Sequence, residues 1–282
     1  MGPLVSQRYL STYRPGWLLP IRDLTELVEH RDLLSLLITK ELKIKYKGTT
    51  LGFMWSLLNP LLMMVVYTAI FSVIARFPLQ QYPIYLLSGL LPWTAFAAAV
   101  TGATLSIILN GHLVRRVKFP NQFLPITSVA AGLVNLIPSL GILLVFVPAF
   151  GRSLGWPLLA LPLLLLLQAV FTAGIALILS AVTVYFRDLE HLIVIALTAL
   201  FYLTPVLYPL DPRALPAGAG KYIGYLELNP LSWVFESYHS VLFYKAWPDL
   251  TQFTLTLVLA LVSLTLGYFI FVTLRPRIPE EV

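Results

Sequence analysis

Cysteine is absent from this sequence, and charged residues are scarce. The absence of cysteine excludes disulfide bonds and zinc sites built on thiolates. Asp, Glu, Lys and Arg make up 11% of the 282 residues, whereas an average soluble domain carries about 25%. Six uncharged stretches result, each near or above the roughly 20 residues with which a helix crosses the hydrocarbon core. They cover residues 48–75, 77–114, 119–151, 153–186, 192–210 and 250–274. A buried soluble core explains one such stretch but not six, so the sequence predicts an all-α, polytopic membrane protein.

The basic residues predict how the spans are oriented. We expect six transmembrane helices at about residues 52–76, 84–109, 123–150, 157–184, 192–208 and 250–274, which form one six-span transmembrane domain over 51–282. Placing both termini in the cytoplasm puts most of the 19 lysines and arginines on the cytoplasmic side, as the positive-inside rule requires. The net charge of +6 follows from this topology and does not indicate nucleic acid binding. With no signal peptide before the first span, the sequence predicts a multi-pass protein of the cytoplasmic membrane.

The N-terminal segment, residues 1–50, is expected to lie outside the spans on the cytoplasmic side. From about Ile21 to Lys47 its pattern becomes helical, with apolar residues on one side and Lys40, Lys43 and Lys47 on another. This pattern predicts an amphipathic helix in the membrane interface, with its lysines facing lipid phosphates. The alternative is a solvated helix packed on protein.

Two shorter segments interrupt the succession of spans. At about 111–120, Val114 and Val117 share one helical face while Arg115 and Lys118 share another, which is typical either of a docking element or of a basic cytoplasmic loop. At about 209–249, Asn229 and the proline after it form an N-cap signal that begins an aromatic helix too short to span. We expect re-entrant or surface helices here, on the outer side and before the last span.

The chemistry of an energy-converting site is missing from this chain. No G-x-x-x-x-G-K-[ST] motif is present, so the chain does not bind ATP in that way by itself. Glu236-x-x-His239 is one helical metal-ligand motif where a di-metal bundle needs two, and no metal site is expected. The spans contain almost no ionisable residue, which argues against an ion-coupled transporter and an intramembrane hydrolase. The energy for any transport is therefore expected to come from a partner.

Four motifs in order carry a resemblance to a known family. The run KIKYKGTTLGFMWSLLNPLLMMVVY, residues 43–67, closely resembles the start of permease subunits of type-2 ABC exporters for polysaccharides. Residues 112–120 resemble the family's coupling helix, 185–189 its cytoplasmic motif after the fourth span, and 229–233 the outer segment before its last span. The resemblance covers nearly the whole chain.

The resemblance implies partners, a substrate class and a set of coupling residues. It implies a homodimeric permease in membrane lipid, served by two copies of a separate ATP-binding subunit that holds ATP and Mg. The permease itself is then not an enzyme and holds no cofactor. The substrate would be a polysaccharide on a polyprenyl pyrophosphate lipid, such as O-antigen, teichoic acid or capsule. The residues implied in coupling to the ATPase subunit are His112, Leu113, Val114, Arg115, Arg116, Val117, Lys118 and Phe119.

Aromatic side chains are the candidates for the substrate path. The resemblance implies that this path lies between two permeases, and we expect these to meet through their first and fifth spans. Aromatic rings offer sugars broad apolar contact with a polar edge. The candidates, with the asparagine that precedes a proline in the first span, are Trp55, Asn59, Tyr67, Phe71, Phe201, Tyr202, Trp233 and Tyr238. The alternative for each aromatic residue is an interfacial belt or lipid-facing packing.

Two other functions compete with polysaccharide export. One is an ABC permease for a drug or small lipid, against which the amphipathic helix joined to the motif at Gly48–Phe53 argues. The other is a membrane-embedded polyprenyl-phosphate glycosyltransferase, which needs clustered acidic residues at one face. Asp188 and Glu190 share a loop but have no further acidic neighbour beyond it.

Overall fold

In the described residues, the protein is a bundle built only of helices. The computed structural model describes residues 29–74, 79–116, 120–210 and 223–281. Within them, five helical segments are long and apolar enough to cross a membrane: Gly52–Ser72, Tyr82–Leu109, Phe123–Ala149, Trp156–Tyr185 and Leu250–Glu281. A sixth apolar helix, Leu189–Leu203, is shorter. The prediction of an all-α polytopic membrane protein is therefore confirmed.

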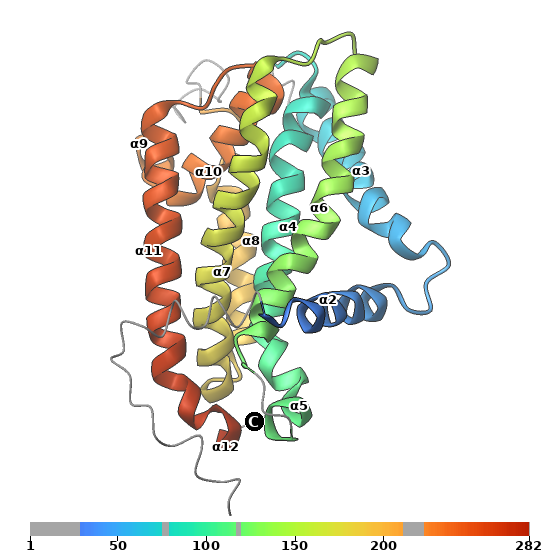
Figure 1. Ribbon diagram of the computed structural model, residues 1–282. Coiled ribbons are helices and arrows are strands. Elements are labelled where there is room, and N and C mark those ends of the chain that lie inside the picture. The colour runs from blue at the N-terminus through green and yellow to red at the C-terminus, as the bar shows by residue number, and fades with distance from the viewer. Residues whose placement is uncertain (1–28, 75–78, 117–119, 211–222, 282) are drawn as a thin grey trace, which may run out of the picture.

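Most of the long helices stand side by side in the bundle (Figure 1). The central helix α4 (Tyr82–Leu109) packs against α6 (Phe123–Ala149) and α7 (Leu161–Tyr185), and α7 packs against α11 (Leu250–Leu274). The first span combines η2 (Gly52–Met54), α3 (Trp55–Thr68) and η3 (Ala69–Ile74), while η4 (Trp156–Ala160) leads into α7. After α11 come η7 (Arg275–Arg277) and α12 (Ile278–Glu281). The core lies around α4, whose residues are largely buried, whereas α3 is mostly exposed.

The α7–α11 pair is joined by direct backbone contact. A Cβ atom added at Gly174 of α7 would collide with the backbone of Ser263 in α11, and one at Gly267 would collide with the backbone of Gly174. The Ser263 hydroxyl also donates a hydrogen bond to the Phe171 carbonyl at 2.9 Å. Helices in lipid gain most from such close van der Waals packing, since burial of apolar surface from water does not drive their association.

The fifth predicted span differs from its expected bounds. Instead of a helix over 192–208, α8 begins at Leu189 and ends at Leu203, which makes it about 22 Å long at 1.5 Å per residue, shorter than the hydrocarbon core. Pro205 is the cause, because the residue before a proline is forced out of the helical region, and Thr204 is indeed extended. The chain continues over 204–207 without helix but buried, as irregular backbone at membrane depth must be.

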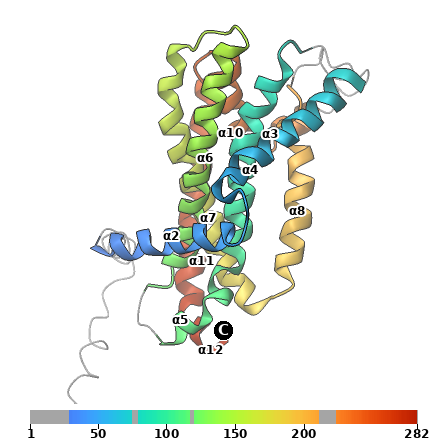
Figure 2. The same cartoon turned by 90° about the vertical axis from the view of Figure 1, so that its right-hand side faces the viewer.

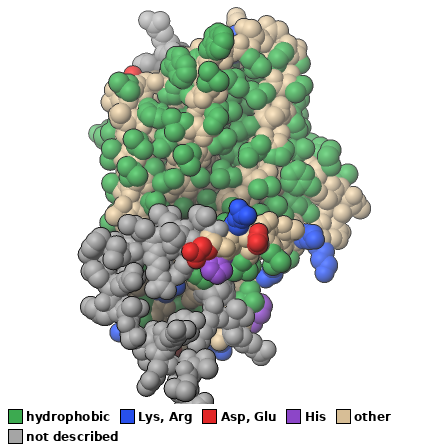
Figure 3. Space-filling model, viewed as in Figure 1, with side chains coloured by type: hydrophobic (Ala, Val, Ile, Leu, Met, Phe, Trp, Pro, Cys, Tyr) green, Lys and Arg blue, Asp and Glu red, His purple; other side chains and the backbone are tan. Residues whose placement is uncertain are grey.

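The N-terminal helix α2 (Arg31–Tyr46) runs across the bundle rather than along it (Figures 1 and 2). Side-chain hydrogen bonds hold it on the bundle, among them two to asparagines. Lys40 Nζ donates to Asn110 Oδ1 and Tyr46 Oη donates to Asn135 Oδ1, both at 2.8 Å. Charged side chains gather at the level of α2, below a wide apolar surface (Figure 3). The helix therefore packs on protein through Lys40, while Lys43 and Lys47 are exposed. Its predicted place in the membrane interface stays a prediction.

The segment before the last span folds into short helices at the end of the bundle away from α5 (Gly111–Arg116). They are α9 (Ile223–Glu227), α10 (Pro230–His239) and η6 (Ser240–Tyr244). The N-cap prediction is confirmed, because Asn229 Oδ1 accepts a hydrogen bond from the Leu231 amide at 3.1 Å. Most of α10 is buried against α4, α7 and α11, so it is an inserted helix and not one lying on the surface.

Candidate functional site

A cavity of about 770 Å³ opens between α2, α3, α4, α6 and α8. A second cavity of about 470 Å³ adjoins it, between α2, α3, α4 and α6. Six residues line both cavities: Lys45, Asn59, Thr94, Ala98, Gly132 and Asn135. The two cavities thus form one continuous hollow on the side of α4 from which α3 and α8 diverge (Figure 2).

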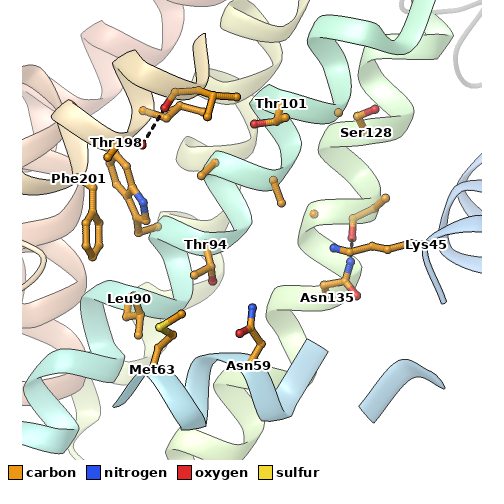
Figure 4. Close-up of a pocket in the computed structure, with 18 of the residues that line it drawn as sticks. Lys45, Asn59, Met63, Leu90, Thr94, Thr101, Ser128, Asn135, Thr198 and Phe201 are labelled. Atoms are coloured by element: carbon orange, nitrogen blue, oxygen red, sulfur yellow. Dashed lines mark hydrogen bonds between the residues drawn. The ribbon is translucent and has the colours of Figure 1, made fainter. Parts of the chain in front are cut away.

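One side of the hollow is polar. Thr94 and Thr101 of α4, with Ser128 and Asn135 of α6, present hydroxyl and amide groups, and Lys45 approaches Asn135 from α2 (Figure 4). Asn135 is fixed on both sides: its Oδ1 accepts from Tyr46 and its Nδ2 donates to the Ala131 carbonyl at 2.9 Å. Because these groups are neutral apart from Lys45, this wall can offer hydrogen bonds without a strong field.

Charged side chains of α2 at the mouth of the hollow shift one another's pKa values. Burial raises the pKa of the Glu41 carboxyl, while a hydrogen bond from Ser128 and the cations of Lys45 and Lys40 lower it. Burial lowers the pKa of Lys45, and the Glu41 carboxylate raises it. Glu41 and Lys45 are four residues apart on one helix, the spacing at which opposite charges are neighbours.

The other side of the hollow is aromatic and apolar. The ring of Phe201 in α8 lies with its centroid 6.0 Å from that of Tyr67, 5.5 Å from that of Trp93 and 5.3 Å from that of Tyr202. Leu90 and Met63 continue this side toward α3 (Figure 4). The cluster brings together residues of α3, α4 and α8, with Tyr202 57% exposed toward the open side.

The structure brings five of the eight predicted path residues to the hollow. Asn59, Tyr67, Phe201 and Tyr202 line the larger cavity, and Trp55 lines the smaller.

The other three predicted path residues lie elsewhere. Phe71 packs on Tyr82, with ring centroids 5.8 Å apart. Trp233 donates its Nε1 to the Glu227 carbonyl at 2.9 Å. Tyr238 has no exposed surface at all, because the inserted helix α10 turns it into the core. In this arrangement none of them lines either cavity.

Sequence reasoning missed the polar wall and Trp93. A signal for the wall was present: in otherwise apolar spans, Thr94 and Thr101 are seven residues apart, and so are Ser128 and Asn135. Seven residues bring side chains back to nearly the same face of a helix. Trp93 gave no such signal, since an aromatic residue in an apolar helix is equally expected in lipid or in the core.

The predicted coupling segment lies at the end of the bundle opposite α9. Val114 of α5 is buried in a small apolar cluster that includes Ile107, Phe271 and Ile278. His112 and Arg115 are exposed. Val117, Lys118 and Phe119 lie outside the described residues, as does the side chain of Arg116. What is described of α5 is a helix anchored on one face and open on the other.

Comparison with known proteins identifies the family. The family described as ABC-2 type transporter matches residues 32–243, a range that includes every residue lining the hollow. This chain belongs to the ABC-2 type transporter family. Membership implies an ABC ATP-binding partner, and permease subunits of the family are generally non-catalytic.

Three relatives of this ABC-2 permease carry informative names. An O-antigen export system permease protein RfbA of Myxococcus xanthus is 35% identical over 93% of this chain and 100% of its own length. A protein of the same name from Klebsiella pneumoniae is 30% identical over 88% of this chain and 94% of its own. The polysialic acid transport protein KpsM of Escherichia coli is 26% identical over 71% of this chain and 77% of its own.

Proposed function

We propose that this ABC-2 permease belongs to an ATP-driven exporter that moves a lipid-linked polysaccharide of the O-antigen type across the cytoplasmic membrane. Two copies of a separate ATP-binding subunit bind ATP and Mg and hydrolyse the ATP. The observation that carries the proposal is the hollow of about 770 Å³ with one polar and one aromatic wall, in a chain that aligns over 93% of its length with a permease named for O-antigen export.

The composition of the hollow suits a long sugar chain. A polymer that slides through a path needs walls that contact it without fixing one geometry. Aromatic faces such as Tyr67, Trp93 and Phe201 make broad contact with the apolar faces of sugar rings. Hydroxyl and amide groups on the opposite wall exchange hydrogen bonds with sugar hydroxyls as readily as water does. A drug or small apolar lipid would gain little from that polar wall.

The open side of the hollow is where a second copy fits. Exposed apolar side chains flank it on α3 and on α8, among them Leu62, Val65, Leu192 and Ile195, each more than half exposed. Two copies facing each other through α3 and α8 would join two hollows into one path closed to water. The lipid tail of the substrate would stay in the bilayer while its sugars cross inside.

Orientation and coupling complete the proposal. The end of the bundle with α5 faces the cytoplasm, together with both termini, and the exposed face of α5 receives the ATP-binding subunit. His112 and Arg115 are exposed for that contact, while Val114 transmits force into the bundle because it is buried there. The remaining coupling residues, 116–119, continue the same docking segment.

Reconstituted transport tests this function. The full chain and its ATP-binding subunits are placed in liposomes, and ATP-dependent movement of a fluorescent lipid-linked oligosaccharide is measured. Tyr67→Ala combined with Tyr202→Ala should slow export roughly tenfold, because two aromatic contacts are lost. Phe269→Ala is the control, since this α11 side chain is 69% exposed and does not line the hollow. Equal export by the double variant and the control would place the path elsewhere, and transport of small lipids only would favour the alternative substrate.

A further inference from the structure

The break after α8 is enclosed by side chains of other helices. Residues 204–207 lie beyond the end of α8, and only the Thr204 amide still donates to a carbonyl of that helix, at Leu200. Thr204, Val206 and Leu207 nevertheless have at most 1% of their surface exposed. A buried carbonyl left without a donor is costly, the more so in lipid where no water can replace it. The carbonyls of this segment therefore need donors from outside α8.

Those donors come from α4 and from the segment that begins α10. The Leu207 carbonyl accepts a hydrogen bond from Tyr82 Oη at 2.8 Å. Asn229 Nδ2 donates to the Leu203 carbonyl at 3.2 Å and to Thr204 Oγ1 at 3.0 Å. Because Asn229 is also the N-cap of α10, one amide ties the end of α8 to the start of α10.

His239 makes the central contact of this junction. Its Nε2 lies 2.9 Å from the Pro205 carbonyl, and its Nδ1 lies 2.7 Å from Ser88 Oγ. A carbonyl only accepts, so Nε2 carries the proton. The Ser88 hydroxyl has one proton, which lies between two acceptors, the Tyr85 carbonyl at 2.6 Å and His239 Nδ1. The imidazole stacks on the Tyr85 ring at 4.0 Å between centroids and 4° between planes. Both ring nitrogens are thereby in hydrogen-bond contact.

The side of α4 facing His239 is shaped to admit it. A Cβ atom at Gly89 would lie 2.7 Å from His239 Cε1 and 3.1 Å from the Val206 carbonyl oxygen. Glycine thus allows the imidazole and the α8 break to approach α4 together. Tyr82, Tyr85, Ser88 and Gly89 recur at helical spacing, so one stripe of α4 is devoted to this junction.

The junction matters for the hollow because α8 has little else to hold it. Outside the break, α8 packs mainly on α4 and only slightly on α7, and it stands apart from the rest of the bundle (Figure 2). Phe201 and Tyr202, which line the hollow, lie within four residues of the break. Where α8 stands, and how wide the hollow is, must then depend on the contacts that fix its end.

We propose that His239 and Asn229 are positioning residues that fix the end of α8 against α4 and α10, and so set the aromatic wall of the substrate path. The predicted effect on transport rests on the proposed function. The role of His239 and Asn229 in fixing the end of α8 rests on the geometry of the junction alone. Neither residue touches the polymer, and both act through Phe201 and Tyr202.

Hydrogen exchange of the full chain, reconstituted with its ATP-binding subunits, tests the positioning directly. Asn229→Asp keeps the oxygen that caps α10 but removes the donor to Leu203 and Thr204. We expect the amides of Thr204, Val206 and Leu207 to exchange about 5- to 150-fold faster in this variant and in His239→Ala, the range set by leaving a buried partner unsatisfied. His239→Gln keeps an N–H donor and should restore most of the protection. His191→Ala is the control, because that histidine lies at the exposed start of α8.

Transport kinetics separate positioning from simple loss of structure. In Asn229→Asp the apparent KM for the lipid-linked substrate should rise several-fold with little change in kcat, because a loosened wall weakens binding before it slows movement. Unchanged exchange over 204–207 in both Asn229→Asp and His239→Ala would overturn the proposal. An equal rise in hydrogen exchange of the α7 amides in these variants would also overturn it, because it would show general loss of structure. Absence of export in the parent chain would refute the proposed function alone, since the exchange result still decides the role of the junction.

Discussion

Asparagine side chains join separate helices of this protein through hydrogen bonds. Asn110 and Asn135 act alike: each accepts a hydrogen bond from α2 through Oδ1 and donates through Nδ2 to a carbonyl of its own helix four residues earlier. The helical bond fixes the amide, so that its oxygen is already aimed when Lys40 or Tyr46 arrives. Preset acceptors of this kind hold α2 on the bundle at two points, Asn110 at the end of α4 and Asn135 in the polar wall.

The α5 residues allow docking and folding to be tested separately. Arg115→Glu reverses an exposed charge and should lower ATP-driven export about tenfold through repulsion at the partner's surface, with thermal stability unchanged. Val114→Asp, by contrast, places a charge in a buried apolar cluster and should lower stability and expression. Export and unfolding midpoints of both variants are measured together. Full coupling in Arg115→Glu would remove this face of α5 from the proposed contact.

The sequence could predict single residues of the hollow only in part. Tyr67, Phe201 and Tyr202 were found because aromatic chemistry suits sugars, and they do line the cavity. Tyr238 has the same chemistry and lies in the core. Nothing local distinguishes the two cases, since the difference depends on how deeply α10 inserts between α4, α7 and α11.

At the scale of elements, the crossing of α7 and α11 is the most demanding contact. Gly174→Ala and Gly267→Ala each force two backbones apart and should destabilise the protein by about 1–3 kcal/mol or more. Gly141→Ala on α6 is the matched control, because a Cβ atom there meets nothing within 4 Å. Unfolding midpoints in detergent compare the three. If Gly174→Ala unfolds like Gly141→Ala, the close crossing is not a feature of the protein in solution.

The spans were predictable as elements, but the end of α8 was not. Absence of charge marks every long helix, because the bilayer excludes charge along its whole depth. Proline does not mark where a helix ends. Pro92 lies inside α4, where its carbonyl accepts a hydrogen bond from Gln168 Nε2 at 2.9 Å, and Pro138 lies inside α6. Pro205 ends α8 instead, because side chains of α4 and α10 satisfy the extended backbone that follows.

The bundle carries α5 at one end and α9 at the other, so the orientation of the protein in the membrane can be tested. The chain has no cysteine, so a single introduced thiol reports one position. Tyr225→Cys, at a site 73% exposed near α9, should react with a membrane-impermeant maleimide added outside intact cells. His112→Cys in α5 should react only after the cells are opened. The reverse pattern would invert the proposed topology and move the ATP-binding subunit to α9.

The larger shape supports the proposal that two copies of the permease form the transport path. The hollow is walled by α2, α3, α4, α6 and α8 and is open where α3 and α8 diverge. Both flanking helices expose apolar side chains there. A permease that paired through these helices would gain a second aromatic and a second polar wall from the same residues, so a path wide enough for a polymer follows from one modest cavity per copy.

Capture of the polymer during export tests most directly that the hollow is the path. A photoreactive amino acid is placed at Thr94 or Thr198, which line the cavity, or at Phe269 as the lipid-facing control. The reconstituted exporter is illuminated during ATP-driven transport of lipid-linked polysaccharide. We expect sugar to be crosslinked at Thr94 and Thr198 only when ATP is present, and not at Phe269. Crosslinking at Phe269, or none at either cavity position while export proceeds, would contradict the account.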